Sequence, residues 1–302
     1  MEINQLKNLL DEFGDNVIFE YDLKKKNWFN IGGKSKVFYK ANNLKELINF
    51  LKKVEDKEKI FILGAGSNTL ITDNLYDGIV IKLSKDFNNI SLLKDDIIIA
   101  GSGVLDKTLS DFAMKNNLSG FEFLSCIPGT IGGGIRMNAG CFGNEFKDIL
   151  LSIQAIDKKG NVLKIPAKDI KFGYRKNDIS EDIIFLSASF KGIKSEYKKI
   201  ENQTKKLKIE KEKNQPTRIK TSGSTFKNPI LQTKKKVWEL IKESVPLDKS
   251  FGDAHISEKH CNFFVNKGEA KFEDMIKLID FVKEKVLKKT GIKLEKEIKI
   301  LK

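Results

Sequence analysis

The chain has few of the residues that define disulfide-rich and zinc-binding proteins. Its 302 residues include three cysteines, two histidines and five prolines. Cys126, Cys141 and Cys261 lie far apart and form no C-x-x-C pair, which argues against a disulfide framework or a zinc knuckle. His255 and His260 are five positions apart, not the four of a helical metal pair, so we predict no metal site.

Long apolar runs are also missing. No segment predicts a membrane span, and the N-terminus has neither the basic start nor the continuous apolar core of a signal peptide. Residues 1–12 have the pattern of an amphipathic helix instead. We therefore expect a cytoplasmic protein without membrane insertion.

Arginine is scarce although the chain is basic. The net charge is +14, yet only three of the 55 basic residues are arginine, and lysine is spread over the whole sequence. Nucleic-acid readers favour the bidentate arginine fork and aromatic stacking platforms, and the sequence has no cluster of either kind. We expect no nucleic-acid partner, and the charge predicts a mild attraction for anionic substrates. A basic nucleic-acid-binding protein remains the alternative from a different functional class.

Glycine, in contrast, is concentrated. Six glycines follow Pro128 within residues 128–143, without low-complexity repetition. Glycine permits positive φ and lets backbone N–H groups approach a ligand, so this segment predicts a cradle for a phosphate-bearing cofactor. We expect that packing alone does not require so many glycines, although a tight buried turn without ligand is the alternative.

A second glycine loop follows a predicted buried strand, Phe61 to Leu63. A dinucleotide-binding Rossmann fingerprint would need a third glycine where Thr69 stands and a helix directly after the loop. The chain runs instead into the β-like segment 79–83, which disfavours a nicotinamide-binding Rossmann domain. The pattern indicates a strand–loop–strand phosphate nest.

Periodicity and composition divide the chain into three expected parts, 1–83, 84–197 and 198–302. Apolar residues at helical spacing predict helices at 3–13, 44–54, 105–116, 194–213, 234–244 and 272–289. Apolar and alternating runs predict strands at 37–39, 61–63, 79–83, 96–100, 149–157 and 183–190. The fold class is therefore expected to be α+β.

Several dispersed motifs occur in the order typical of one enzyme family. They are Asn30–Gly33, Gly64–Asn68, Gly120–Leu124, Ile127–Gly132, Met137–Gly140, Phe172–Arg175, Gly223–Pro229, Ser257–Phe263 and Leu294–Ile298. Together they resemble the UDP-N-acetylenolpyruvoylglucosamine reductases, from about Asn27 to the C-terminus. The resemblance implies the FAD-binding fold of the p-cresol methylhydroxylase and vanillyl-alcohol oxidase superfamily, followed by a C-terminal α+β substrate domain.

The resemblance also implies the reaction and its cofactors. NADPH would reduce FAD, and the reduced flavin would deliver hydride to UDP-N-acetylglucosamine enolpyruvate, yielding UDP-N-acetylmuramate for peptidoglycan. A flavin oxidase of the same fold acting on another substrate is the alternative. No histidine precedes His255, so the histidyl linkage of some superfamily members has no candidate near the FAD loops, and FAD is expected to be non-covalent. The residues implied in cofactor binding are Gly64, Ala65, Gly66, Ser67, Asn68, Pro128, Gly129, Thr130, Gly132, Gly133, Asn138 and Gly140.

Three residues match the catalytic positions of the family. Arg175 would bind the substrate carboxylate through its planar fork, with a surface salt bridge as the alternative. Ser224 would donate the proton, although a serine in such a turn more often caps a backbone N–H. Glu297 matches the third position, and Glu295 is its rival because the alternating pattern leaves the orientation open.

The resemblance further implies Tyr174, Lys227 and Asn228 as substrate-binding residues, the last two at the UDP part. Two features depart from the commonest family pattern. Residues 245–252 replace an apolar, glycine-rich stretch, and only 49 positions separate Arg175 from Ser224. The short interval resembles the subclass without a tyrosine-bearing loop over the substrate, so no such tyrosine is assigned.

Overall fold

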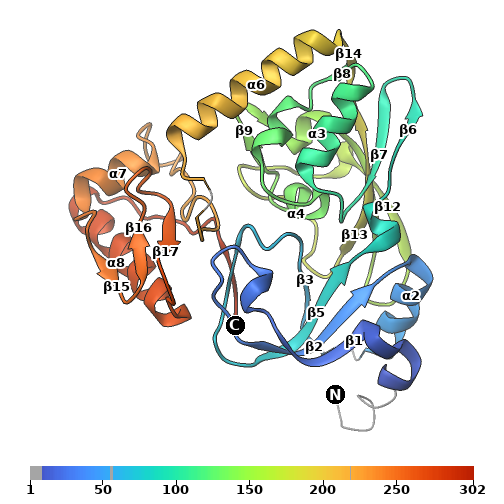
Figure 1. Ribbon diagram of the computed structural model, residues 1–302, viewed down its shortest axis with the longest axis horizontal. Helices are drawn as coiled ribbons and strands as arrows, with labels where there is room; N and C mark the ends of the chain where they lie inside the picture. The colour runs from blue at the N-terminus through green and yellow to red at the C-terminus, as the bar shows by residue number, and fades with distance from the viewer. Residues whose placement is uncertain (1–8, 55–56, 218) are drawn as a thin grey trace. The chain divides into compact units, whose positions relative to one another are not determined.

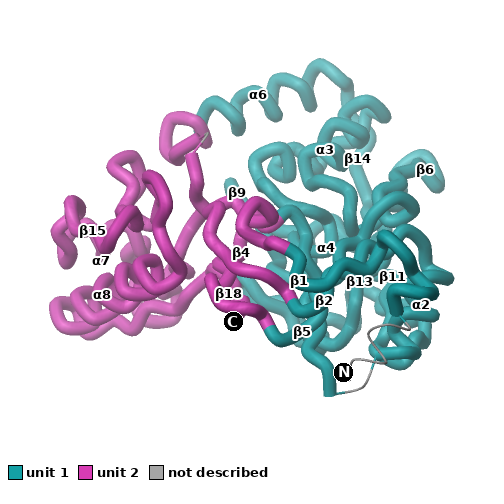
Figure 2. The backbone as a smooth tube through the Cα atoms, turned by 60° about the horizontal axis from the view of Figure 1, so that its bottom comes forward, with its two compact units in different colours: residues 1–21, 36–65, 77–210 teal, residues 22–35, 66–76, 211–302 magenta. Residues whose placement is uncertain are grey.

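The computed structural model describes residues 9–54, 57–217 and 219–302. The chain forms two compact units, each assembled from separate stretches (Figure 2). Unit 1 comprises residues 1–21, 36–65 and 77–210, and unit 2 comprises residues 22–35, 66–76 and 211–302. Two short stretches near the N-terminus thus belong with the C-terminal part, a grouping that composition does not suggest.

A four-stranded sheet forms the first part of unit 1. Its order is β1 (Val17–Asp22), β2 (Lys34–Ala41), β5 (Tyr76–Leu83), β3 (Ile60–Ile62), and β3 runs parallel to β5. Helix α2 (Leu44–Lys53) begins where the Asn43 side chain accepts a hydrogen bond from the Glu46 N–H at 2.9 Å, a side-chain N-cap. Its buried Phe50 stacks on Tyr39 of β2 with ring centroids 3.8 Å apart, which fixes the helix on this core.

The second part of unit 1 is a five-stranded antiparallel sheet (Figure 1). Its order is β12 (Val162–Pro166), β11 (Leu150–Ile156), β13 (Ile184–Lys191), β7 (Ile97–Gly101), β6 (Ile90–Lys94). Helix α3 (Asp106–Lys115) buries Leu109 and Ala113, four residues apart, in the same core as Phe146 and Phe190.

Short elements complete unit 1 and carry the glycine-rich segment. They are β8 (Leu118–Ser119), α4 (Ile131–Arg136), β9 (Gly140–Cys141), β10 (Asn144–Glu145), α5 (Phe146–Ile149) and β14 (Ile193–Lys194). Strand β9 pairs with β10, and β8 pairs with β14, both antiparallel. Helix α6 (Tyr197–Asn214) is mostly polar and exposed and contains the residues at which the chain passes from unit 1 to unit 2.

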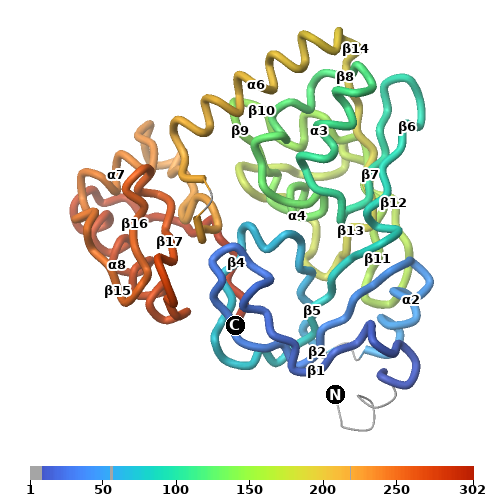
Figure 3. The backbone as a smooth tube through the Cα atoms, viewed as in Figure 1, coloured from blue at the N-terminus to red at the C-terminus, as the bar shows by residue number. Residues whose placement is uncertain are grey.

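Unit 2 packs two helices, α7 (Val237–Ser244) and α8 (Phe272–Thr290), with a small antiparallel sheet of β15 (Ser250–Phe251), β16 (Ala254–Ile256) and β17 (Phe264–Asn266) (Figure 3). Helix α8 buries six apolar side chains along one face and ends at Gly291, whose φ of 72° is the left-handed C-cap conformation. Strand β18 (Lys299–Leu301) pairs in parallel with β4 (Thr69–Ile71), joining the C-terminus to residue 71.

The predicted helices and strands are confirmed within a few residues, except where the prediction for 3–13 includes residues 1–8, which lie outside the described part. Two local predictions were wrong: residues 69–71 form strand β4 and residues 131–136 form helix α4, where we expected loop. Among the helices of the described residues, none is long and apolar enough to cross a membrane.

Candidate functional site

The two glycine-rich segments meet within unit 1. Gly64 follows β3, and a Cβ placed on it would lie 2.6 Å from the Thr130 hydroxyl at the start of α4. Lys82 of β5 donates a hydrogen bond to the Gly64 carbonyl. Because Gly64 has no side chain, the backbone after β3 lies directly against Thr130. The loop that begins at Gly64 and the glycine-rich segment that includes Thr130 are therefore in contact.

The glycines of α4 have different surroundings, which corrects the expectation that packing does not require them. A Cβ on Gly134 would lie 2.3 Å from the Phe146 ring, and one on Gly132 would lie 2.9 Å from Ser102 Cβ. Gly133 is exposed, and its Cβ would meet only the Thr130 hydroxyl at 3.6 Å. Packing thus accounts for Gly132 and Gly134, and Gly133 is the glycine that presents open backbone.

The second half of the 64–68 loop belongs to unit 2. Gly66 has a φ of 68°, and a Cβ there would lie 2.1 Å from the Lys26 carbonyl oxygen, so only glycine fits. The Asn68 side-chain amide donates to the Glu297 backbone carbonyl at 3.1 Å, and the Asn68 backbone carbonyl accepts from Lys299 N–H at 2.9 Å. Asn68 therefore fixes the C-terminal segment that carries Glu297.

Arg175 stands in a tight turn closed by backbone hydrogen bonds between Gly173 and Lys176. Its φ is 56°, a left-handed conformation that costs a non-glycine residue of order 1 kcal/mol. The guanidinium donates to the carbonyl oxygens of Gly140 at 2.6 Å and Asn138 at 3.4 Å, and it lies 4.9 Å from the Tyr174 ring centroid. The two hydrogen bonds hold the Arg175 guanidinium against the backbone of residues 138–140.

Arg136, the other described arginine, contacts backbone carbonyl oxygens and an aromatic ring. Its guanidinium donates to the carbonyl oxygens of Ile179, Ser180 and Ile183 and stacks 4.1 Å from the Phe185 ring centroid. Burial lowers the pKa of Arg136 from its ordinary value. These contacts join the end of α4 to the loop before β13.

Ser224, Lys227 and Glu297 come together in unit 2. Residues 225–227 pair antiparallel with 295–297, because Lys227 N–H donates to the Glu295 carbonyl and Glu297 N–H donates to the Thr225 carbonyl. Glu297 is half-buried, whereas the Glu295 carboxylate is 73% exposed and lies 3.8 Å from Lys227 Nζ. Ser224 is half-buried and pairs antiparallel with Phe263 through a single β-bridge.

The side chains of Asn228 and Asn138 form hydrogen bonds with neighbouring segments of the protein. The Asn228 side-chain oxygen accepts from Val237 N–H at 3.0 Å and so fixes the start of α7. Asn138 is fully buried; its amide donates to Glu145 and to the Gly173 carbonyl and accepts from Lys147 N–H. Sequence reasoning missed Glu145, because an acidic residue after a glycine-rich motif carries no signal of its own.

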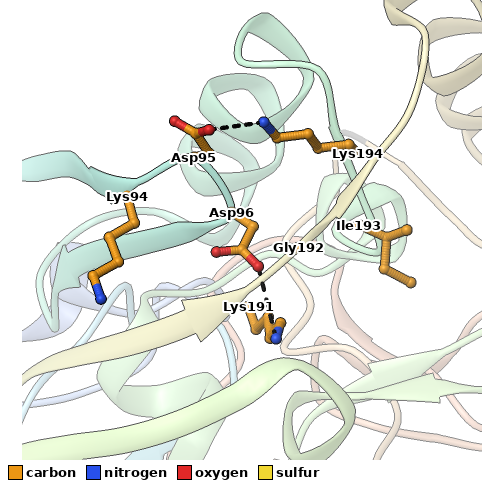
Figure 4. A pocket seen from close by; sticks show the side chains of 7 residues that line it. All are labelled: Lys94, Asp95, Asp96, Lys191, Gly192, Ile193 and Lys194. Carbon is orange, nitrogen blue, oxygen red and sulfur yellow. Dashed lines mark hydrogen bonds and ion pairs between the residues drawn. The ribbon is translucent and has the colours of Figure 1, made fainter.

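A surface hollow of about 780 Å³ lies at the tip of the β6–β7 hairpin, beside the end of β13 (Figure 4). Lys191 pairs with Asp96 at 3.7 Å and Lys194 with Asp95 at 3.0 Å, so the charges lining the hollow largely neutralise one another. None of its residues belongs to the predicted site, and we assign no function to it.

The histidines lack the surroundings of a metal site. His260 is partly buried, its Nδ1 accepts from Asn262 N–H at 3.3 Å, and desolvation lowers its pKa. Within the described residues, no group of three or more His, Cys, Asp or Glu side chains could hold a metal ion.

Comparison with known proteins gives matches over the whole chain. A family model for an FAD binding domain matches residues 35–166, and one for the C-terminal domain of UDP-N-acetylenolpyruvoylglucosamine reductase matches residues 215–301. The UDP-N-acetylenolpyruvoylglucosamine reductase of Pelagibacter ubique is 66% identical over 302 residues, covering 100% of both chains. That of Rickettsia conorii is 43% identical over 280 residues, covering 93% of this chain and 94% of the relative.

A solved structure agrees with these sequence matches. The crystal structure of the corresponding reductase from Thermus caldophilus superimposes with a TM-score of 0.81 at 28% identity, covering 95% of this chain and 98% of the other. The expected fold, an FAD-binding domain followed by a C-terminal α+β domain, is thereby confirmed. The chain belongs to the UDP-N-acetylenolpyruvoylglucosamine reductase family and is an FAD-dependent oxidoreductase.

Proposed function

We propose that the protein reduces the enolpyruvyl ether of UDP-N-acetylglucosamine to UDP-N-acetylmuramate, with NADPH as the source of electrons. The observation that carries this proposal is the 66% identity to the Pelagibacter ubique reductase over the full length of both chains. Supply of a peptidoglycan precursor in the cytoplasm follows from the same reaction.

The residues present fit a bound FAD. Gly64 lies directly against Thr130, and Gly133 presents open backbone on the same helix, so phosphate or ring atoms could approach without meeting a Cβ. When bound, FAD supplies the hydride, which no side chain can provide. The absence of histidine before His255 supports a non-covalent cofactor.

Arg175 has the geometry to hold the substrate carboxylate. Its guanidinium is fixed by two carbonyl oxygens, so the planar fork does not need to be ordered when substrate binds. Negative charge accumulates toward the carboxylate as hydride adds to the neighbouring carbon, and a fixed cation lowers the energy of that state.

Ser224 would supply the proton that completes the reduction. Hydride adds to one carbon of the double bond and a proton to the other, so the product gains two hydrogens and the serine alkoxide is reprotonated from solvent. Glu297, half-buried on the segment paired with 225–227, would be the third catalytic residue, and Lys227 and Asn228 would contact the UDP part. The exposure of the Glu295 carboxylate supports Glu297 over its rival.

The test is to follow the two half-reactions separately under anaerobic conditions. NADPH should bleach the flavin of the purified yellow protein, and the enolpyruvyl nucleotide sugar should then restore its colour and yield a product two mass units heavier. Reoxidation by oxygen alone, with no effect of that substrate, would instead indicate a flavin oxidase.

Two arginine variants form a matched pair for this test. Arg175→Lys keeps the charge but loses the fork, so substrate-dependent reoxidation should slow while NADPH-driven reduction changes little. Arg136→Lys should lower stability, because carbonyl contacts are lost, without slowing reoxidation of the folded flavoprotein. Equal loss of both half-reactions in Arg175→Lys would contradict the assignment.

A further inference from the structure

Glu145 is a partly buried carboxylate that no established role explains. It ends strand β10 and forms the N-cap of α5 in a capping box with Asp148, whose carboxylate accepts from Glu145 N–H at 2.7 Å. Its side chain is 20% exposed. The hydrogen bond to Asp148 fixes the backbone at Glu145, and the contacts of the carboxylate itself decide its direction.

The carboxylate divides its two oxygens between different partners. Oε1 lies 3.6 Å from Arg175 Nη1. Oε2 accepts from the Asn138 side-chain amide at 3.0 Å and pairs with Lys147 Nζ at 2.8 Å. One oxygen is thus anchored by Asn138 and Lys147, which leaves the other directed at the arginine.

The short β9–β10 hairpin brings these groups to Arg175. Gly140 pairs with Glu145 across the hairpin, and a Cβ on Gly140 would lie 2.3 Å from the Asn144 carbonyl oxygen. Only glycine permits this close hairpin, which places the Gly140 carbonyl and the Glu145 carboxylate at one guanidinium. The buried Asn138 amide ties the same carboxylate to the Gly173 carbonyl, two residues before Arg175.

We propose that Glu145 is a positioning residue that fixes the Arg175 fork in the orientation required for the substrate carboxylate. The inference rests on the proposed function of Arg175 and deepens it. An arginine side chain has many rotamers, and the carboxylate restricts them before substrate arrives. The pair is only 16% and 20% exposed, so water screens it less than a surface pair.

The experiment uses the full-length flavoprotein and the two half-reactions. Glu145→Gln keeps the shape of the side chain but removes the charge that faces Arg175. We expect normal FAD content, NADPH-driven reduction within about twofold of wild type, and substrate-driven reoxidation slowed by about tenfold or more, since small misplacements of a binding group cost factors of this size. Asp95→Asn is the matched control: it makes the same carboxylate-to-amide change in an exposed ion pair of unit 1, 3.0 Å from Lys194, and should reoxidise at the wild-type rate.

A double-mutant cycle separates positioning from a purely structural role. If Glu145 acts through the arginine, Glu145→Gln should slow reoxidation by less than about twofold once Arg175→Lys is present. A full additional loss in that background, or an equal loss of both half-reactions in the single variant, would overturn the proposal.

The outcomes also distinguish this proposal from the one on which it rests. Normal reoxidation in Glu145→Gln, with slow reoxidation in Arg175→Lys, removes only the role of Glu145. Normal reoxidation in Arg175→Lys refutes the role of Arg175 and this proposal with it. If Glu145→Gln does not fold, Glu145→Asp replaces it, because its shorter side chain moves the charge away from Arg175 by one methylene. This variant must then show slow substrate-driven reoxidation and near-normal NADPH-driven reduction. If neither variant folds, Glu145 has a structural role.

Discussion

Two adjacent glycines of α4 should respond in opposite directions to the same substitution. Gly134 faces the ring of Phe146, and an added Cβ would lie 2.3, 2.5 and 3.1 Å from three ring carbons. Phe146 is fully buried and has Phe123 and Phe190 as ring neighbours, with centroids 6.3 and 6.1 Å away, so the ring cannot move without displacing others. Gly133 is exposed, and its Cβ would meet only Thr130 at an ordinary 3.6 Å.

The expected magnitudes follow from these contacts. Alanine gains about 1 kcal/mol over glycine within a helix at both positions. Overpacking a close-packed core costs about 1–3 kcal/mol, and an overlap of more than 1 Å with a trapped ring belongs at the upper end. We expect Gly134→Ala to lower the free energy of unfolding by about 2 kcal/mol and Gly133→Ala to raise it by up to about 1 kcal/mol.

Urea denaturation of the FAD-free protein, followed by far-ultraviolet circular dichroism, measures this difference. Both tryptophans, Trp28 and Trp238, belong to unit 2, so their fluorescence would not report directly on α4. Equal stability of the two alanine variants would refute the argument that Phe146 enforces glycine at position 134. Flavin titration of the same proteins adds a second readout: Gly133→Ala should weaken FAD binding by tenfold or more if the open backbone contacts the cofactor.

The other predictions concern single side chains. Asp106 is fully buried without a hydrogen-bond partner for its carboxylate among the described residues, and burial raises its pKa well above the ordinary value. Between the unfolded pKa of about 4 and the raised folded pKa, the folded protein keeps a proton that the unfolded chain releases, so stability should fall as pH rises, by up to about 1.4 kcal/mol per pH unit. Asp106→Asn should remove that slope, and a wild-type–variant difference in stability that stays constant as pH rises from about 4 would contradict it. Ser224→Ala should slow substrate-driven reoxidation by roughly a hundredfold to ten-thousandfold while NADPH-driven reduction stays near normal; wild-type reoxidation would make Ser224 a structural turn residue. Acid precipitation should release all FAD into solution, and flavin retained in the pellet would show a covalent bond.

Local sequence pattern predicted most helices and strands, because apolar periodicity is set by neighbours within a few positions. Strand β4 was missed, since its three residues acquire strand structure by pairing with β18, more than two hundred positions away. The same pairing places residues 66–76 in unit 2, whereas composition groups them with the N-terminal part. Strands as short as three residues that pair over long range show no hydrophobic periodicity by which the sequence could predict them.

The glycine-rich segment shows that a motif can predict where a binding site lies without predicting which of its residues contact the ligand. A glycine beneath an aromatic ring and a glycine against a ligand are identical in sequence, because both positions exclude a Cβ. Phe146, twelve positions after Gly134, decides that this glycine is required by packing, while Gly133 remains available to a cofactor.

Arg175 and Glu145 extend that argument to charged residues. Arg175 and Arg136 are two of only three arginines in the chain, and Arg136 donates hydrogen bonds to three backbone carbonyl oxygens. The two arginines differ in that Arg175 occupies a left-handed turn and faces a carboxylate anchored on its far oxygen. The left-handed backbone of Arg175 costs free energy, and the Glu145 carboxylate lies beside its guanidinium; both features fit the proposed role, in which the guanidinium is held ready for a second carboxylate.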